Sequence, residues 1–184
     1  MDFIERLLLS DGHNMILVIA DWLTKMALFI PTFLDIDSGE VAMLFLHYVF
    51  AKHGTPSDTI LDQGKHFTSQ FWASLCEILS IKGNLFTTYH PQTNGSTEWI
   101  NQILEQYLWI YINYQQDDWA NLLPLSEFTY NNTAHFATQV TLFFANKGFH
   151  LKLKVSLTSV ALEDAYCQSA DLKDFHQYLQ DQIR

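Results

Sequence analysis

Two acidic residues, Asp62 and Glu98, have the type and placement that metal-dependent chemistry requires, with 35 residues between them. Asp62 follows the short apolar run 59–61, which predicts a buried strand ending at this carboxylate. Glu98 falls in the first turn of a predicted long helix, on the face opposite its apolar side chains. Mg²⁺ prefers oxygen ligands, and two such ions stabilise both the attacking and the leaving oxygen of a phosphodiester. The pair therefore suggests a divalent-metal site.

Taken singly, each acid also has a simpler interpretation. Acidic side chains are common on solvated helix faces, and an Asp at the end of a strand is more often an ordinary polar residue than a catalytic one. The surrounding sequence favours the chemical interpretation. Asp62 lies in LDQGKHFTSQFW at 61–72, and Glu98 ends YHPQTNGSTE at 89–98.

These two segments resemble the second and third catalytic segments of retroviral-type integrases, and most closely those of gypsy-type long-terminal-repeat retrotransposons. The Asp/35/Glu spacing with an intervening Tyr-His-Pro-Gln motif is specific to this pattern. The resemblance covers nearly the whole chain. Its further segments are 16–31, 101–108, 114–119 and 143–146.

The resemblance implies three catalytic acids, which we assign to Asp2, Asp62 and Glu98. Together they would hold two Mg²⁺ or Mn²⁺ ions. The first acid of such enzymes lies upstream of the run that resembles 16–31, in a strand that ends like Met1-Asp2-Phe3-Ile4. Asp21 is the alternative first acid, and otherwise a structural or turn residue. The simpler interpretation of Asp2 is a disordered terminal acid.

The implied activity is DNA integration, in which the enzyme processes the 3′ ends of the element's DNA and transfers the strands to target DNA. DNA and further copies of the chain would be partners, and the location would be the nucleus. Lys65, Gln92 and Asn94 are candidates for contacts with nucleic acid, although each is also explained by simple exposure. The alternative function is a catalytically dead or host-adopted remnant that binds nucleic acid or associates with proteins.

The order of the predicted elements indicates an α/β domain with a mixed sheet. Apolar, β-branched runs at 15–21 and 25–31 predict two adjacent strands that form a hairpin. The resemblance narrows the class to a ribonuclease-H-like mixed sheet flanked by helices, with a truncated first strand and a C-terminal helical tail. Residues 1–148 would form the catalytic core. Residues 149–184 would be a linker and a helix leading to a missing C-terminal domain.

Helices are predicted from capping residues and apolar spacing. One begins with Ser38 as its N-cap and ends at Gly54. Thr68 is expected to cap another, whose apolar side carries Phe71, Leu75, Ile78 and Leu79. The other expected elements are a strand at 83–88, a long helix from about 96 to 114, and helices at 119–130 and 171–183.

The charge balance opposes the nucleic-acid interpretation, because 10 Lys and Arg face 20 Asp and Glu for a net charge of −10. Polyanion binding draws much of its affinity from basic side chains. Trp22, Gln63, Trp99 and Trp109 stand where the resemblance leads us to expect basic residues, so the activity of this chain is in doubt. Cys76 and Cys167 are too few for a disulfide framework or a four-cysteine zinc site.

The longest apolar run, 15–20, is too short to cross a bilayer. The acidic N-terminal start does not resemble a secretory signal, which favours an intracellular protein.

Overall fold

The computed structural model describes residues 1–61, 67, 69–85, 99–106, 108, 112–135 and 139–152. Within these residues, no helix has the length and apolar character that a membrane span needs. The strands are β1 (Asp2–Ile4), β2 (Met15–Ala20), β3 (Ala27–Thr32), β4 (Asp58–Leu61) and β5 (Lys82–Leu85). The helices are α1 (Ser38–Phe45), the π-helical segment η1 (Leu46–Phe50), α2 (Ala51–His53), α3 (Gln70–Ile78), α5 (Trp119–Asn131) and α6 (Leu142–Lys147). Residues 99–106 are also helical.

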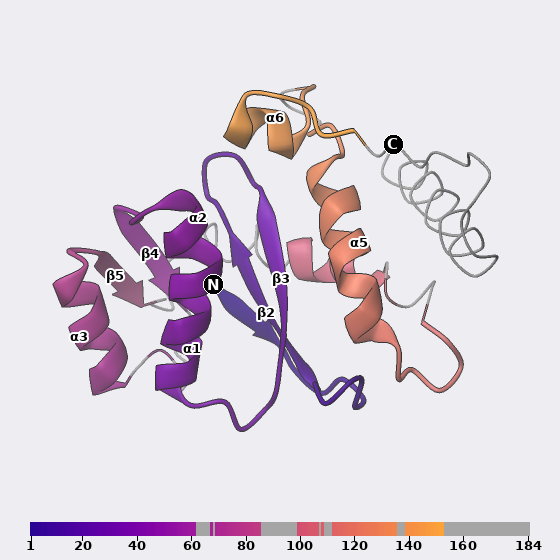
Figure 1. Ribbon diagram of the computed structural model, residues 1–184, viewed down its shortest axis with the longest axis horizontal. Coiled ribbons are helices and arrows are strands. Elements are labelled where there is room, and N and C mark those ends of the chain that lie inside the picture. The colour runs from indigo at the N-terminus through magenta and orange to yellow at the C-terminus, as the bar shows by residue number, and fades with distance from the viewer. Residues whose placement is uncertain are drawn as a thin grey trace, which may run out of the picture.

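The strands form two small sheets that meet at β1. Strands β1, β2 and β3 pair antiparallel in that order, with Asp2 opposite Val18, whereas β4 and β5 pair parallel. The amino group of Met1 donates to the backbone oxygen of Ile60 at 2.8 Å, which brings β1 beside β4. Helix α3 lies near β5 at one end of the molecule, and α5 lies beside β3 at the other (Figure 1). The arrangement is the predicted mixed α/β sheet flanked by helices.

The hairpin predicted from the apolar runs is confirmed. Residues Met15–Ile19 of β2 are buried, as expected for an apolar, β-branched run that is covered on both faces. Strand β2 pairs with β3 from Met15 opposite Thr32 to Ala20 opposite Ala27. The strand β2 is therefore the centre of the three-stranded sheet and of the hydrophobic core.

The N-cap of the first helix is Asp37, one residue before the predicted N-cap Ser38. The Asp37 carboxylate accepts from the Glu40 backbone N–H at 2.8 Å, and the Glu40 carboxylate accepts from the Asp37 N–H at 3.0 Å. This reciprocal pair satisfies two backbone donors. The helical path then continues through η1 and α2 to Gly54, whose φ of 80° suits glycine and ends it as predicted.

The predicted apolar side of α3 is right at Leu75 and Leu79, which are partly buried against the core, and wrong at Phe71 and Ile78. Ser69 is the N-cap, and its hydroxyl accepts from the Trp72 N–H at 3.2 Å, whereas Thr68 lies outside the described residues. Trp72 and Cys76 are buried, but Phe71 is 55% and Ile78 is 79% exposed. The Trp72 ring packs edge-on against Phe45 and Phe67, each with ring centroids at 5.5 Å, and these contacts set the rotation of the helix.

The other elements follow the prediction where they are described. Strand β5 covers Lys82–Leu85, and residues 86–88 of the expected strand lie outside the described part. The apolar face of the predicted long helix is confirmed at Ile100, Leu104 and Leu108, which are buried. The expected helix at 171–183 and most of the proposed linker lie outside the described residues, so the boundary at 148 stays a prediction.

Helix α5 covers the outer edge of β3 with two polar side chains. The Asn131 amide accepts from the Ala27 N–H at 2.9 Å and donates to the Ala27 carbonyl at 2.7 Å. The Glu127 carboxylate accepts from the Phe29 N–H at 2.8 Å. Pro31, the next outward-facing position, has no N–H to satisfy. These side chains occupy backbone groups that would otherwise form an open sheet edge.

Replacing Asn131 by Ala should leave the buried N–H and carbonyl of Ala27 without partners. We expect the free energy of unfolding to fall by about 2–6 kcal/mol, because each of the two buried unsatisfied groups costs about 1–3 kcal/mol. Chemical denaturation measures the change. The matched control is Asn121→Ala on the exposed side of α5, and equal effects of the two substitutions would contradict this role of Asn131.

The buried carboxyl of Glu127 should make the free energy of unfolding depend on pH. Burial raises the pKa of its carboxyl, against lowering by the Phe29 hydrogen bond and by Lys52 and Lys147. A raised pKa in the folded state means that folding is favoured by protonation, so this contribution is present at low pH and is lost as the pH rises through the folded pKa. In Glu127→Gln the contribution is absent. The unfolding free energy of the variant minus that of the parent should therefore increase from pH 4 to pH 7.

Denaturation curves across this pH range check the slope. Glu77→Gln on the exposed side of α3 serves as the control. A difference that stays flat or falls with rising pH would contradict the assignment.

Candidate active site

Asp2 is half-buried within β1, and its carboxylate is held on both oxygens. Oδ1 accepts from the Phe3 backbone N–H, and Oδ2 accepts from the Asn101 side-chain amide, each at 2.8 Å. The backbone of Asp2 lies opposite Val18 in the β1–β2 ladder. The interpretation of Asp2 as a disordered terminal acid is therefore wrong, because sheet pairing and side-chain hydrogen bonds both fix it.

The described residues that flank the other two predicted acids both reach β1. Ile60 accepts the hydrogen bond from Met1, and Leu61, the last residue of β4, directly precedes Asp62 in the sequence. Asn101 lies three positions after Glu98 and bonds directly to Asp2. Three separate segments of the chain, β1, β4 and the helical residues 99–106, thus converge on one small region.

Five of the predicted site residues lie outside the described part of the chain. They are Asp62, Lys65, Gln92, Asn94 and Glu98. Their positions therefore stay predictions. Within the described ranges, no group of three or more His, Cys, Asp or Glu side chains is arranged to hold a metal ion.

Asp21 has a structural role in the turn between β2 and β3. Its carboxylate accepts from the Thr24 backbone N–H at 2.9 Å and from the Thr24 hydroxyl. Its backbone N–H donates to Met26 and its carbonyl accepts from Lys25, at 2.8 and 2.9 Å. These bonds close the turn, and the Asp21 carboxylate makes its hydrogen bonds within its own loop. The assignment of Asp2 rather than Asp21 as the first acid stays a prediction.

The sequence prediction missed Asn101. Its Nδ2 orients Asp2, while its Oδ1 is buried and finds no hydrogen-bond partner among the described residues. Buried polar atoms are nearly always paired, so an unpaired acceptor beside a carboxylate marks a polar site. A signal was present in the sequence, because residues three apart share one face of a helix, and Asn101 follows Glu98 by three.

The described oxygen atoms beside Asp2 are of the kind that Mg²⁺ binds, although by themselves they are too few to hold the ion. Oxygen is the ligand atom that Mg²⁺ prefers, and this region offers the Asp2 carboxylate with the unpaired Asn101 Oδ1 next to it. Both recorded hydrogen-bond donors to Asp2 are neutral amides, which leave the carboxylate charge for a cation and leave further lone pairs on each oxygen.

Comparison with known sequences finds relatives among transposon polyproteins. The Tf2-3 and Tf2-4 polyproteins of Schizosaccharomyces pombe are each 35% identical over 143 residues, which is 78% of this chain. The aligned part spans only 11% of each polyprotein. No protein-family model matches the sequence.

Solved structures share the fold over most of the chain. The HTLV-2 integrase catalytic core domain in complex with magnesium, in its trimeric form, has a TM-score of 0.63 at 18% identity, covering 79% of this chain and 92% of that one. This chain has the fold of an integrase catalytic core. The BIV integrase core gives a TM-score of 0.60 at 19% identity, covering 76% and 88%. The simian T-cell lymphotropic virus intasome in complex with PP2A regulatory subunit B56 gamma gives 0.67 at 22%, covering 88% and 58%.

The integrase-core fold confirms the predicted ribonuclease-H-like class. The predicted first strand corresponds to β1, which covers Asp2–Ile4 and pairs with β2, while the neighbouring Met1 bonds to Ile60 of β4.

Proposed function

We propose that this chain is the catalytic core of a retrotransposon integrase of gypsy type, which processes the 3′ ends of element DNA and transfers them to target DNA. The observation that carries the proposal is the convergence on Asp2 of the residues that flank Asp62 and Glu98. The similarity to Tf2 polyproteins supports the retrotransposon origin, and the integrase-core fold supports the reaction class.

Asp2, Asp62 and Glu98 would hold two Mg²⁺ ions in this proposal. When bound, such ions activate the attacking water or 3′-hydroxyl and stabilise the leaving oxygen of the phosphodiester. The magnesium in the HTLV-2 core supports a divalent metal for this fold. Pairing of β1 with β2 fixes the backbone of Asp2, and Asn101 fixes the direction of its carboxylate. Lys65, Gln92 and Asn94 would contact DNA.

The low number of basic residues makes assembly important for DNA binding. With a net charge of −10, one copy supplies few phosphate contacts. We infer that the chain acts as a homo-oligomer, in which several copies share the DNA, and that it acts in the nucleus, where target DNA lies. The dimeric and trimeric forms of the HTLV-2 core support oligomerisation.

Asp62→Asn should abolish metal-dependent joining of an oligonucleotide that carries the element's end sequence. We expect the rate to fall at least about 100-fold, because a neutral amide replaces one of the three proposed metal-binding carboxylates. A strand-transfer assay with Mg²⁺ and with Mn²⁺ measures the change. The control is Asp35→Asn, an exposed acid in the loop before α1. Equal activity of parent and Asp62→Asn protein would overturn the assigned triad.

Asn101→Ala should weaken Mg²⁺ binding without removing a proposed ligand. We expect about a tenfold rise in the Mg²⁺ dissociation constant, since residues that orient a metal ligand typically contribute this much. Calorimetric titration reads the affinity independently of activity. Gln102→Ala, at an exposed neighbouring position, is the matched control. Unchanged affinity in Asn101→Ala would show that this amide does not position Asp2 for the metal.

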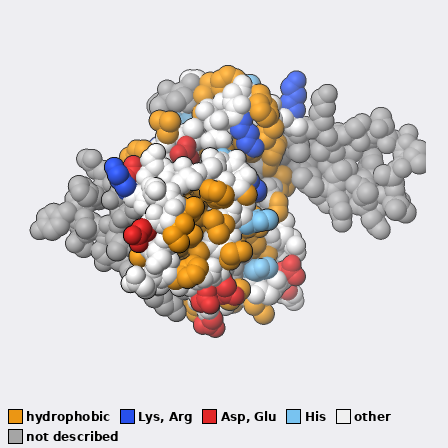
Figure 2. All heavy atoms as spheres, turned by 60° about the vertical axis from the view of Figure 1, so that its left-hand side comes forward, with side chains coloured by type: hydrophobic (Ala, Val, Ile, Leu, Met, Phe, Trp, Pro, Cys, Tyr) orange, Lys and Arg blue, Asp and Glu red, His pale blue; other side chains and the backbone are white. Residues whose placement is uncertain are grey.

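A second candidate function, association with proteins, is favoured by one surface. Exposed apolar side chains gather over α1, η1 and α3 (Figure 2), including Met43 at 65% exposure and Phe71 at 55%. Large exposed apolar patches mark interaction sites. If this is the whole function, the chain forms a stable complex through that face, and the strand-transfer assay above shows no activity even in the parent protein.

A further inference from the structure

A groove of about 630 Å³ lies between the end of β3, the first turns of α1 and the start of α3. Phe33, Met43 and Phe71 line this groove, and all three are exposed. Ile78 is exposed on the same side of α3 as Phe71, which it follows by two helical turns. We call these four residues the α1–α3 face. Figure 2 shows the exposed apolar surface over these helices.

The helices α1 and α3 are held together beneath this face by two packed rings. Phe45 of α1 meets Trp72 of α3 edge-on, with ring centroids at 5.5 Å, and both side chains are buried. A helix at the surface of a protein normally turns one apolar side to the core and a polar side to solvent. The α1–α3 face is therefore a second apolar side of the helix pair, which the described core leaves uncovered.

The described Lys, Arg, Asp and Glu side chains around the α1–α3 face are all acidic. Asp37 and Glu40 line the groove, and Glu77 is exposed on α3. The two segments that carry the face, 33–51 and 67–81, contain no Lys or Arg. Because opposite charges across an interface favour association, this surface is complementary to a partner with basic side chains.

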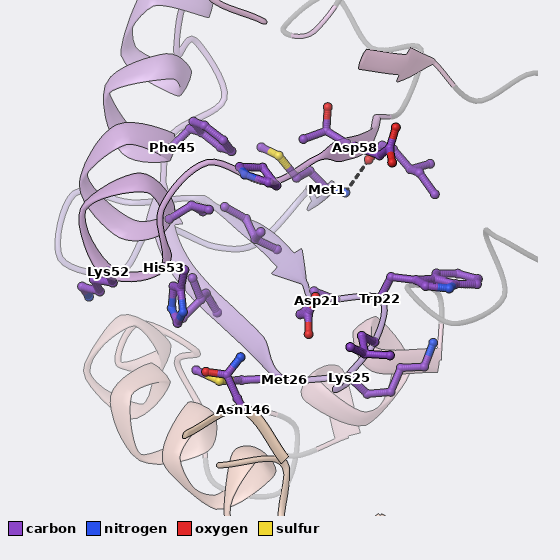
Figure 3. Close-up of a pocket in the computed structure, with 18 of the residues that line it drawn as sticks. Met1, Asp21, Trp22, Lys25, Met26, Phe45, Lys52, His53, Asp58 and Asn146 are labelled. Atoms are coloured by element: carbon purple, nitrogen blue, oxygen red, sulfur yellow. Dashed lines mark hydrogen bonds between the residues drawn. The ribbon is translucent and has the colours of Figure 1, made fainter. Parts of the chain in front are cut away.

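Basic side chains of the chain gather at a different cavity. Lys25, Lys52 and Lys147 line that cavity, and Figure 3 shows Lys25 and Lys52 there. The ammonium group of Lys25 lies over the Trp22 ring, 4.1 Å from its centroid. Positive charge is thus present at that cavity and is missing from the residues that line the groove of the α1–α3 face.

The longer helices of this chain offer no basic side chains to a second copy. The helices α1, α3 and α5 and the helical residues 99–106 contain no Lys or Arg. The helix predicted at 171–183 has Lys173 against three aspartates. A second copy docked through one of these helices would bring acidic or neutral side chains to an acidic face, and like charges repel. The charges therefore favour a different protein as the partner.

A pair of helices recognises a partner through side chains. The backbone N–H and carbonyl groups inside a helix are already bonded to each other, so the α1–α3 face offers no edge for an added strand. A partner helix can instead place its own apolar side chains between those of α1 and α3, as amphipathic helices do in apolar grooves. Basic residues beside its apolar stripe would reach the carboxylates of Asp37, Glu40 and Glu77.

We propose that the α1–α3 face binds an amphipathic helix of a partner protein, with an apolar stripe on one side and Lys or Arg beside that stripe. The proposal rests on the second candidate function, association with proteins, and names the chemistry of the partner. It does not depend on DNA integration. Since the charges of the two surfaces are opposite, binding weakens as the salt concentration rises.

The test adds a fluorescent peptide of about 18 residues to the full chain, with Leu at helical spacing and Lys or Gln elsewhere. Fluorescence anisotropy at low salt measures the affinity. A matched peptide with Glu in place of every Lys should bind at least about tenfold more weakly, because its charges have the sign of the carboxylates around the face. Absence of binding by the Lys peptide, or equal binding of the two peptides, would overturn the proposal.

Substitutions at exposed positions locate the binding site. Phe71→Ala should weaken binding of the Lys peptide at least about fivefold, because a central aromatic contact is lost. Leu23→Ala, at an exposed apolar position outside the face, is the matched control. Glu77→Gln should weaken binding by about two- to threefold, as expected for an exposed ion pair, with the exposed Glu5→Gln as its control. Equal effects of Phe71→Ala and Leu23→Ala would show that the peptide binds elsewhere, and the proposal would be wrong.

Sedimentation velocity of the chain without peptide distinguishes a partner protein from a second copy. Phe71→Ala should leave the oligomeric state of the chain unchanged, because the proposed partner is a different protein. If the substitution lowers the oligomeric state, a second copy covers the α1–α3 face. Association through this face would then stand, while the basic partner helix would be excluded.

Discussion

Residues Met1 to Ile4 connect the two small sheets, and the candidate site depends on this connection. Asp2 pairs with Val18 on one side, while the neighbouring Met1 reaches Ile60 of β4 on the other. The same short strand carries the carboxylate that Asn101 holds. A break in these few bonds would separate Asp2 from β4 and from the helical residues 99–106 together, so the geometry of the site and the continuity of the sheet have a common cause.

The two sides of the central hairpin, the outer edge of β3 and the free side of β2, are covered by different groups. The outer edge of β3 is closed by Asn131 and Glu127, which occupy its backbone groups, and by Pro31, which lacks a donor. The other edge is covered by β1 only along residues 16–18 of β2.

The sequence offered candidate acids for the site, and of the proposed triad the structure describes Asp2. The resemblance placed the first acid at Asp2 rather than Asp21, whose carboxylate and backbone bond within its own turn. Asn101 was missed, because its role depends on contact with a residue 99 positions away. The assignment of Asp62 and Glu98 to the site depends on the resemblance and on the described residues next to them.

The sequence by itself determined the elements whose signals are local. The apolar run of β2 predicted a buried strand, and the next apolar run predicted its hairpin partner. Gly54 predicted the end of a helix, because glycine readily adopts the positive φ found there. Only the tertiary structure decided that Trp72 rather than Phe71 faces the core, since Trp72 packs against Phe45 and Phe67. It also decided the partners of Asn101 and Asn131, because the geometry of a hydrogen bond between distant segments is fixed by packing and leaves no periodic pattern in the sequence.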